Sequence, residues 1–287
     1  MARTVVVTDS TASLAPDVAE SWSVVVVPLQ LMVGDRTLDE DPQASADTVT
    51  AALRQREQVS TSRPNPDVML ATYERAAADG ATELVSVHLS SKLSGTYESA
   101  QLAARRSPIP VRTVDTGQLG MGTGFAALAA ARAVAAGGDG VAAEAAARTC
   151  ADATRSLFYV DTLEHLRRGG RIGAAQALLG SVLAVKPLLT ISDGTVVPLD
   201  KARTSTRALQ RLVELSVEAA RTLEGPVDVA VQHLASAQRA GDVAGRLCER
   251  LQLDEVDVSE VGGVLGAHVG PGMVAVVLAP RWTPPAE

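Results

Sequence analysis

The stretch SSKLSGTYESA, residues 90–100, gathers hydroxyl side chains around a glycine, a combination that suits the binding of an anion. It follows the apolar run ELVSVH at residues 83–88, so Ser94, Gly95 and Thr96 fall where a strand should give way to a helix. Free backbone N–H groups and the helix dipole favour a negative group there, and glycine lets a ligand approach the backbone closely. Because one helix cap does not need so many hydroxyls, the stretch favours a binding site.

Two further clusters have similar chemistry. The segment TDSTASL at residues 8–14 begins after an apolar run, and STSRPNP at residues 60–66 holds Thr61, Ser62 and Arg63 in a loop stiffened by prolines. Hydroxyls on a rigid loop donate to an anion with little loss of entropy. A helix cap explains the same residues, and both interpretations stay open.

His268 lies in VGGVLGAHVGPG, residues 261–272, which we expect to be a glycine-rich loop between two strands. An imidazole on such a loop is able to donate to an oxyanion. Ser94 and His268 together raise the alternative of a Ser/His hydrolase. This alternative is the weaker one, because the nucleophile-elbow pattern is absent around Ser94 and the sequence designates no acid to orient the histidine.

Glycines 120, 122 and 124 raise a third alternative, a nucleotide site. The dinucleotide fingerprint fails, since Phe125 stands where its third glycine is required, and close packing of a helix on a sheet explains the glycines better. Two arginine-rich segments remain. LEHLRRGGRIG contains Arg171 at an expected helix end, and LDKARTSTRAL contains Arg203 near a helix start. The first has the composition of a solvated basic helix end, and the second is either a solvated face or a contact for a phosphate or a partner.

Composition limits the classes of function. The chain has 287 residues, a net charge of −7 and 2% aromatic residues, so it lacks the basic surface and the stacking platforms of a nucleic-acid-binding protein. The two cysteines have no histidine at metal-ligand spacing, so we expect no metal site. No stretch is long and apolar enough for a signal peptide or a membrane span, and we expect a cytoplasmic protein with no transmembrane segment.

Short β-branched runs alternate with alanine-rich helical runs, which predicts an α/β fold. In the first half the alternation predicts a wound, mostly parallel sheet. SDG at residues 192–194 predicts a hairpin. The pattern changes near residue 155, so we expect an N-terminal α/β domain over residues 1–155 and a C-terminal α/β domain over residues 156–287. Helices are expected over 44–57, 66–78, 97–106, 123–136, 140–154, 161–168, 173–184, 204–222 and 236–252.

The motifs together resemble one family over nearly the whole chain. The segments VTDSTASL, TSRPNP, SSKLSGTYESA, VDTGQLGMGTG, LEHLRRGGRIG, LDKAR and GAHVGPG occur in the order and spacing of the DegV family, which includes the fatty-acid-binding subunit of bacterial fatty acid kinase. The resemblance implies a two-domain fold with one long-chain fatty acid held between the domains. It implies no catalysis by this chain alone and no cofactor.

The resemblance also implies roles for individual residues. The fatty carboxylate would be bound by Thr61 or Ser62 and by Ser94 with the Gly95 backbone, with His268 nearby. Arg171 would lie near the domain junction, and Arg203 would face an ATP-dependent kinase subunit that converts the bound acid to an acyl-phosphate for phospholipid synthesis. We expect a monomer. Arg63 stands where family members often have Gln, a change that either alters the charge around the head group or turns to solvent.

Overall fold

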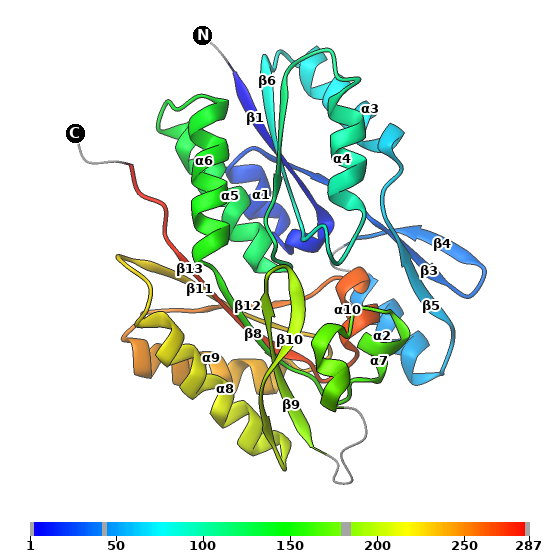
Figure 1. Ribbon diagram of the computed structural model, residues 1–287, viewed down its shortest axis with the longest axis vertical. Helices are drawn as coiled ribbons and strands as arrows, with labels where there is room; N and C mark the ends of the chain where they lie inside the picture. The colour runs from blue at the N-terminus through cyan, green and yellow to red at the C-terminus, as the bar shows by residue number, and fades with distance from the viewer. Residues whose placement is uncertain (1–2, 42–44, 179–184, 285–287) are drawn as a thin grey trace.

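The computed structural model describes residues 3–41, 45–178 and 185–284. The first sheet is parallel, with strand order β2-β1-β6-β7, and forms the upper half of Figure 1. Its strands are β1 (Thr4–Asp9), β2 (Val24–Val27), β6 (Glu83–His88) and β7 (Val111–Asp115). Strands β1 and β6 are rich in valine because helices cover both of their faces. This confirms the α/β class and the wound parallel sheet expected for the first half.

A second, mixed sheet forms the lower half of Figure 1, with order β10-β9-β8-β13-β11-β12. The strands are β8 (Arg155–Tyr159), β9 (Lys186–Ser192), β10 (Thr195–Ala202), β11 (Val227–His233), β12 (Asp257–Glu260) and β13 (Val274–Pro280). Neighbours pair antiparallel except β11 and β12. The predicted hairpin joins β9 to β10, and its central residues Asp193 and Gly194 have φ values of 48° and 71°. This left-handed pair matches the twist of the two strands.

A third sheet was not expected from the sequence. It is antiparallel, with order β4-β3-β5, and contains β3 (Gln30–Val33), β4 (Arg36–Asp39) and β5 (Val59–Ser62). Thr61 and Ser62 therefore lie at the end of a strand, and their expected placement on a loop is wrong. Each strand has only four residues, too few for an alternating pattern to identify, and β5 forms because β3 supplies its hydrogen-bond partners.

The helices confirm most of the sequence expectations. They are α1 (Pro16–Ser21), α2 (Ser45–Arg54), α3 (Pro66–Ala78), α4 (Thr96–Ala104), α5 (Met121–Ala135), α6 (Gly140–Ala153), α7 (Glu164–Arg168), α8 (Ser205–Ala220), α9 (Ala237–Leu251) and α10 (Gly263–Val269), with 3₁₀ turns η1 (Ser10–Ala12) and η2 (Gly173–Leu178). The α-helix expected over 173–184 is wrong where it is described, because 173–178 is a 3₁₀ turn; residues 179–184 lie outside the described residues. Within the described ranges, no helix has the length and apolarity that crossing a bilayer requires.

Helix α10 corrects the expected loop around His268. Glycine disfavours a helix by roughly 1 kcal/mol per residue, which argued against one here. In the structure, Glu40 and Ser45 accept hydrogen bonds from the first two N–H groups of α10. Gly263 has no room for a Cβ, because the main chain and side chain of Ser45 lie 2.9 Å from its position. Close packing and capping thus stabilise a helix that propensity alone would not.

Helices α5 and α6 lie between the parallel and the mixed sheets. Helix α5 is buried on nearly all sides, as its run of alanines predicts. One apolar cluster joins Val6 and Val85 of the parallel sheet to Ala230 and Val277 of the mixed sheet through these helices. Residue 155, the last of the proposed N-terminal domain, is the first residue of β8 in the mixed sheet. The two halves share this core, and the division into two domains stays a prediction.

Replacing Gly124 with alanine should destabilise the protein, although alanine is the better helix former. A Cβ on Gly124 would lie 2.5 Å from the carbonyl oxygen of Ala12, so the η1–α5 contact would have to open. We expect Gly124→Ala to lower the free energy of unfolding by about 1–3 kcal/mol in urea denaturation. The control is Gly245→Ala on the exposed face of α9, where nothing lies within 4 Å of the Cβ position; it should raise the free energy of unfolding by about 0.5–1 kcal/mol. Equal gains in both variants would contradict the packing argument.

Candidate functional site

A mostly apolar cavity of about 330 Å³ lies where the three sheets meet, a volume at the lower end of small-molecule sites, which span roughly 300–1,000 Å³. Its apolar lining is Leu29, Leu89, Leu93, Leu119, Phe158, Leu166, Val196, Val264, Leu265 and Val269. Among the described lining residues, Phe158 is the one Phe, Tyr or Trp. The remaining lining is polar: Thr11, Thr61, Ser62, Arg63, Ser94, Gly95, Arg171 and His268. The structure thus brings together six of the seven residues singled out from the sequence, with Arg203 the exception.

The hydroxyls of SSKLSGTY divide between two roles. Ser90 is buried and its hydroxyl donates to the carbonyl of Gly194 at 2.7 Å, which fastens the β9–β10 turn to the loop after β6. Ser94 lines the cavity, and its Oγ lies 2.8 Å from Thr96 Oγ1 and accepts from the Thr96 N–H at 3.3 Å. Ser91 is exposed. The cluster therefore both closes the junction between the sheets and presents one hydroxyl to the cavity.

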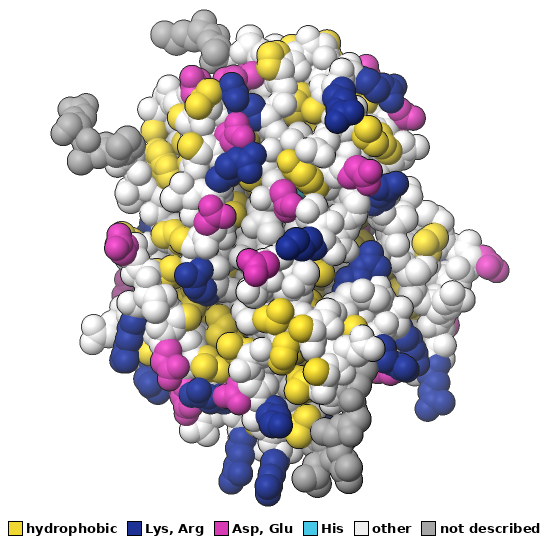
Figure 2. Space-filling model, viewed as in Figure 1, with side chains coloured by type: hydrophobic (Ala, Val, Ile, Leu, Met, Phe, Trp, Pro, Cys, Tyr) yellow, Lys and Arg dark blue, Asp and Glu magenta, His cyan; other side chains and the backbone are white. Residues whose placement is uncertain are grey.

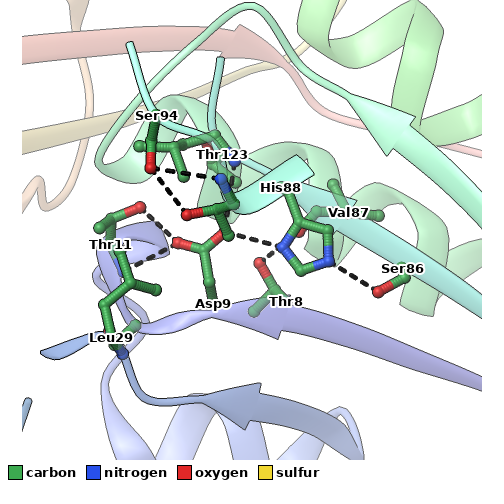
Figure 3. A network of polar contacts seen from close by, with 12 residues as sticks. Thr8, Asp9, Thr11, Leu29, Ser86, Val87, His88, Ser94 and Thr123 are labelled. Carbon is green, nitrogen blue, oxygen red and sulfur yellow. Dashed lines mark hydrogen bonds and ion pairs between the residues drawn. The ribbon is translucent and has the colours of Figure 1, made fainter. Parts of the chain in front are cut away.

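A buried carboxylate holds the loop that carries Thr11 (Figure 3). Asp9 ends β1 and accepts from the Thr11 backbone N–H at 3.1 Å and from the Leu89 N–H at 3.3 Å. Its other partner is His88 Nδ1, at 2.9 Å, so the Asp9 carboxylate lies between Thr11 and the imidazole. The cap is confirmed, since Asp9 caps η1. Thr11 lies in the cavity wall, and the role of this segment in anion binding stays a prediction.

His88 was missed by the sequence analysis, where it stood only as the last residue of an apolar run. Its Nε2 lies 2.7 Å from Ser86 Oγ, which in turn lies 2.8 Å from the hydroxyl of Tyr73. The hydrogen bonds run from Asp9 through His88 to Ser86, as they do in a catalytic triad, but each of the three residues is 0% exposed. A nucleophile sealed in the core and bonded to a second hydroxyl cannot reach a substrate, so the network supports the site and does no chemistry.

His268 lies in the last turn of α10, and its Nε2 is 2.9 Å from Thr61 Oγ1. Burial, assisted by the nearby charge of Arg171, lowers the pKa of His268 to about 4, so the ring is neutral at physiological pH. Among the described residues, Nδ1 has no hydrogen-bond partner. Ser94 contacts Thr96 and His268 contacts Thr61, so the pair that a Ser/His hydrolase requires does not form.

The two arginines that line the cavity are both engaged. Arg171 donates to the carbonyl of Leu93 at 3.0 Å and to the carbonyl of Gly169 at 2.6 Å, which ties the α7–η2 segment to the SSKLSG loop. Arg63 is exposed, forms a 2.6 Å ion pair with Glu98 and lies directly over Gly95, where a Cβ would clash with it. The Arg63 guanidinium and Cδ both lie over Gly95, and the same guanidinium nitrogen is paired with Glu98 at the surface.

A second hollow, of about 600 Å³, opens on the other side of Thr61 and His268 and shares these two residues and Arg171 with the cavity. Its remaining charged and titratable lining is Arg56, Glu57, His165 and Arg168. The polar part of the cavity is thus separated from a mainly basic groove by a single layer of side chains.

The other sequence motifs lie elsewhere. Gly122 and Gly124 pack the start of α5 against Gln118 and against the Ala12 backbone, as close helix packing predicts. Arg203 lies between β10 and α8, is exposed, and does not belong to the described lining of the cavity. On the face in Figure 2, basic and acidic side chains are interspersed. The described residues contain no group of three His, Cys, Asp or Glu side chains placed to hold a metal ion.

Comparisons with known proteins agree on one family. The profile described as "Uncharacterised protein, DegV family" matches residues 3–281. A DegV domain-containing protein of Streptomyces coelicolor is 50% identical over 277 residues, covering 96% of this chain and 98% of the relative. The protein DegV of Bacillus subtilis is 32% identical, covering 94% of this chain and 97% of the relative.

Two solved structures have the same fold. A DegV family protein of Thermus thermophilus, described by its fatty acid binding, has a TM-score of 0.87 and 31% identity, covering 97% of this chain and 99% of that one. DegV of Bacillus subtilis, described as a fatty acid binding protein, has a TM-score of 0.88 and 31% identity, covering 98% and 100%. Since the profile spans nearly the whole chain and the fold agrees over the same length, this chain belongs to the DegV family.

Proposed function

We propose that this protein binds one long-chain fatty acid in the cavity, with the acyl chain along its apolar lining and the carboxylate at its polar residues. The observation that carries the proposal is the composition of the cavity: an apolar lining together with polar residues from five separate segments, two of which are joined by the Thr61–His268 hydrogen bond. The fatty acid binding described for the two similar structures supports the same ligand class.

The energetics suit a fatty acid. At ~0.8 kcal/mol per buried methylene, a palmitoyl-length tail gains roughly 10 kcal/mol from an apolar lining. A carboxylate buried without partners would cost several kcal/mol and offset much of that gain. The head group therefore needs donors, and the hydroxyls of Thr61, Ser62 and Ser94, the Gly95 backbone and the His268 ring are the candidates that line the cavity.

These donors are neutral, which affects the reactivity of the bound acid. His268 is uncharged at physiological pH, and Arg171 donates two of its N–H groups to the backbone carbonyls of Leu93 and Gly169. A carboxylate held by neutral donors keeps more of its negative charge on oxygen than one clamped by a guanidinium. Its oxygen is then available to attack a phosphoryl group.

We infer that the protein presents this carboxylate to a separate ATP-dependent kinase subunit and does not itself catalyse. A carboxylate oxygen would form a bond to the γ-phosphorus of ATP as the bond to the β-phosphate oxygen breaks, giving an acyl-phosphate and ADP. The groove beside His268 supports this role, because Arg56 and Arg168 offer positive charge near the head group. Exposed Arg203 is the residue we assign to the surface that the kinase meets.

Mass spectrometry of a denaturing organic extract of the purified protein should detect about one equivalent of a long-chain fatty acid. The apolar cavity would retain such a ligand through purification. If the extract is empty, and stays empty after incubation with oleate and with palmitate, the proposed ligand is wrong.

Ser94→Ala should weaken fatty-acid binding roughly 10- to 100-fold, because it removes a hydroxyl that donates to a charged group, worth about 1.5–3 kcal/mol. Ser91→Ala, in the same loop but exposed, is the matched control and should bind like the wild type. Arg203→Ala should also bind normally but slow kinase-dependent formation of acyl-phosphate, measured by hydroxamate trapping. Equal losses of binding in Ser94→Ala and Arg203→Ala would refute this division of roles.

Delipidated wild-type protein should lose stability as the pH falls from about 6.5 towards 4. The folded pKa of His268, about 4, lies below its usual 6.5, so the unfolded chain binds more protons in this range. The full effect is on the order of 3 kcal/mol. In urea denaturation His268→Gln should show a shallower loss, since its amide still bonds Thr61 without titrating. Identical pH profiles would show that His268 is not held neutral.

A further inference from the structure

Glu40 is a buried carboxylate with no part in the contacts described for the head group. It directly follows β4 and is 5% exposed. Its Oε1 accepts from the backbone N–H of Val264 at 2.7 Å, and its Oε2 accepts from the hydroxyl of Ser10 at 2.5 Å. The two oxygens therefore join α10 to the end of β1, segments more than 250 residues apart in the chain.

The Ser10 side of this contact belongs to one wall of the cavity. Ser10 Oγ donates to Glu40 and accepts from the Leu29 N–H at 2.9 Å. The backbone N–H of Glu40 in turn donates to the carbonyl of Leu29 at 2.7 Å. Leu29 and Thr11, the neighbour of Ser10, both line the cavity. Glu40 thus holds this wall through its main chain and its side chain together.

The Val264 side belongs to the opposite wall. Helix α10 contributes Val264, Leu265, Val269 and His268 to the lining. The first turn of α10 sets the position of the helix along its axis. There Ser45 accepts from the Gly263 N–H and Glu40 accepts from the Val264 N–H. Gly262 presses against the same carboxylate, and a Cβ there would clash with Oε1. A displacement of this turn would carry His268 away from Thr61, because the helix has only seven residues.

We propose that Glu40 is a positioning residue that fixes α10 against the β1–β3 wall, keeping His268 on Thr61 and the cavity closed over its ligand. The part of this inference that concerns ligand retention rests on the proposed function. A carboxylate is suited to the position because both oxygens accept and neither donor has another partner there. Glutamine still accepts from Val264, but its NH₂ group faces Ser10 and leaves that hydroxyl hydrogen without its acceptor.

The chain contains a matched control in Glu83. Its Oε1 accepts from the Gly140 N–H at 2.6 Å and from the Thr4 hydroxyl at 2.7 Å, so it joins a helix start to β1 as Glu40 does. Glu83 lies at the start of β6 and does not belong to the described lining of the cavity. Substitutions at Glu83 therefore report the cost of losing such a contact without touching the cavity walls.

The first readout is the dissociation rate of cis-parinaric acid, a fluorescent fatty acid, followed by displacement with excess oleate. We expect Glu40→Ala to dissociate roughly tenfold faster or more than wild type, Glu40→Gln to be intermediate, and Glu83→Ala to match wild type despite its own loss of stability. Wild-type dissociation rates in both Glu40 variants would overturn the proposal. If Glu40→Ala does not fold, the test compares the dissociation rates of Glu40→Gln and Glu83→Gln. Faster dissociation from Glu40→Gln alone would support the proposal, and equal rates would overturn it.

The second readout needs no ligand and separates this inference from the proposed function. The imidazole ¹⁵N signals of His268, assigned with His268→Gln, report its hydrogen bond to Thr61 in the delipidated protein. They should shift in Glu40→Gln and stay unchanged in Glu83→Gln. If wild-type protein binds no fatty acid but this shift occurs, the proposed function fails and the positioning role stands. Unchanged His268 signals in Glu40→Gln would overturn the positioning role.

Discussion

The hydrogen bond between Thr61 and His268 joins residues 207 positions apart, and much of the polar architecture around the cavity holds its two partners in place. Thr61 is fixed by the pairing of β5 with β3, in which it lies opposite Leu31. His268 is fixed by α10, whose first turn is held by Glu40 and Ser45. Each partner is positioned by a segment far from it in sequence, so the contact depends on the tertiary assembly of these segments.

Close packing between the sheets makes this assembly specific. One apolar cluster spans the parallel and the mixed sheets through the alanine-rich helices α5 and α6. Larger side chains such as Leu119 and Phe158 line the cavity instead of filling the space. Turn contacts, including Ser90 with Gly194 and Arg171 with Leu93, then close its edges.

The charged groups in and around the cavity are engaged with other parts of the protein. Asp9 is paired with His88 in the core, Arg171 is engaged with backbone carbonyls, and Arg63 is paired with Glu98 at the surface. Burial also raises the pKa of Glu40, whose partners are a hydroxyl and a backbone N–H. The hydroxyls and the neutral His268 ring in the cavity lining carry no formal charge, and the two guanidinium groups in the lining are already bonded to Glu98 and to backbone carbonyls.

The sequence by itself determined the α/β class, the valine-rich parallel sheet, the Asp193–Gly194 hairpin and most helices, because these depend on local periodicity and turn chemistry. It also determined the DegV resemblance and the residues that proved to line one cavity, since their types and order are properties of the chain. Only the tertiary structure decided the placement of Thr61 on a strand and of His268 on a helix. Strand β5 exists through its pairing with β3, and α10 through acceptors supplied by Glu40 and Ser45. The roles of Asp9, His88 and Glu40 were hidden for the same reason: their partners are brought to them by folding, and no local pattern records them.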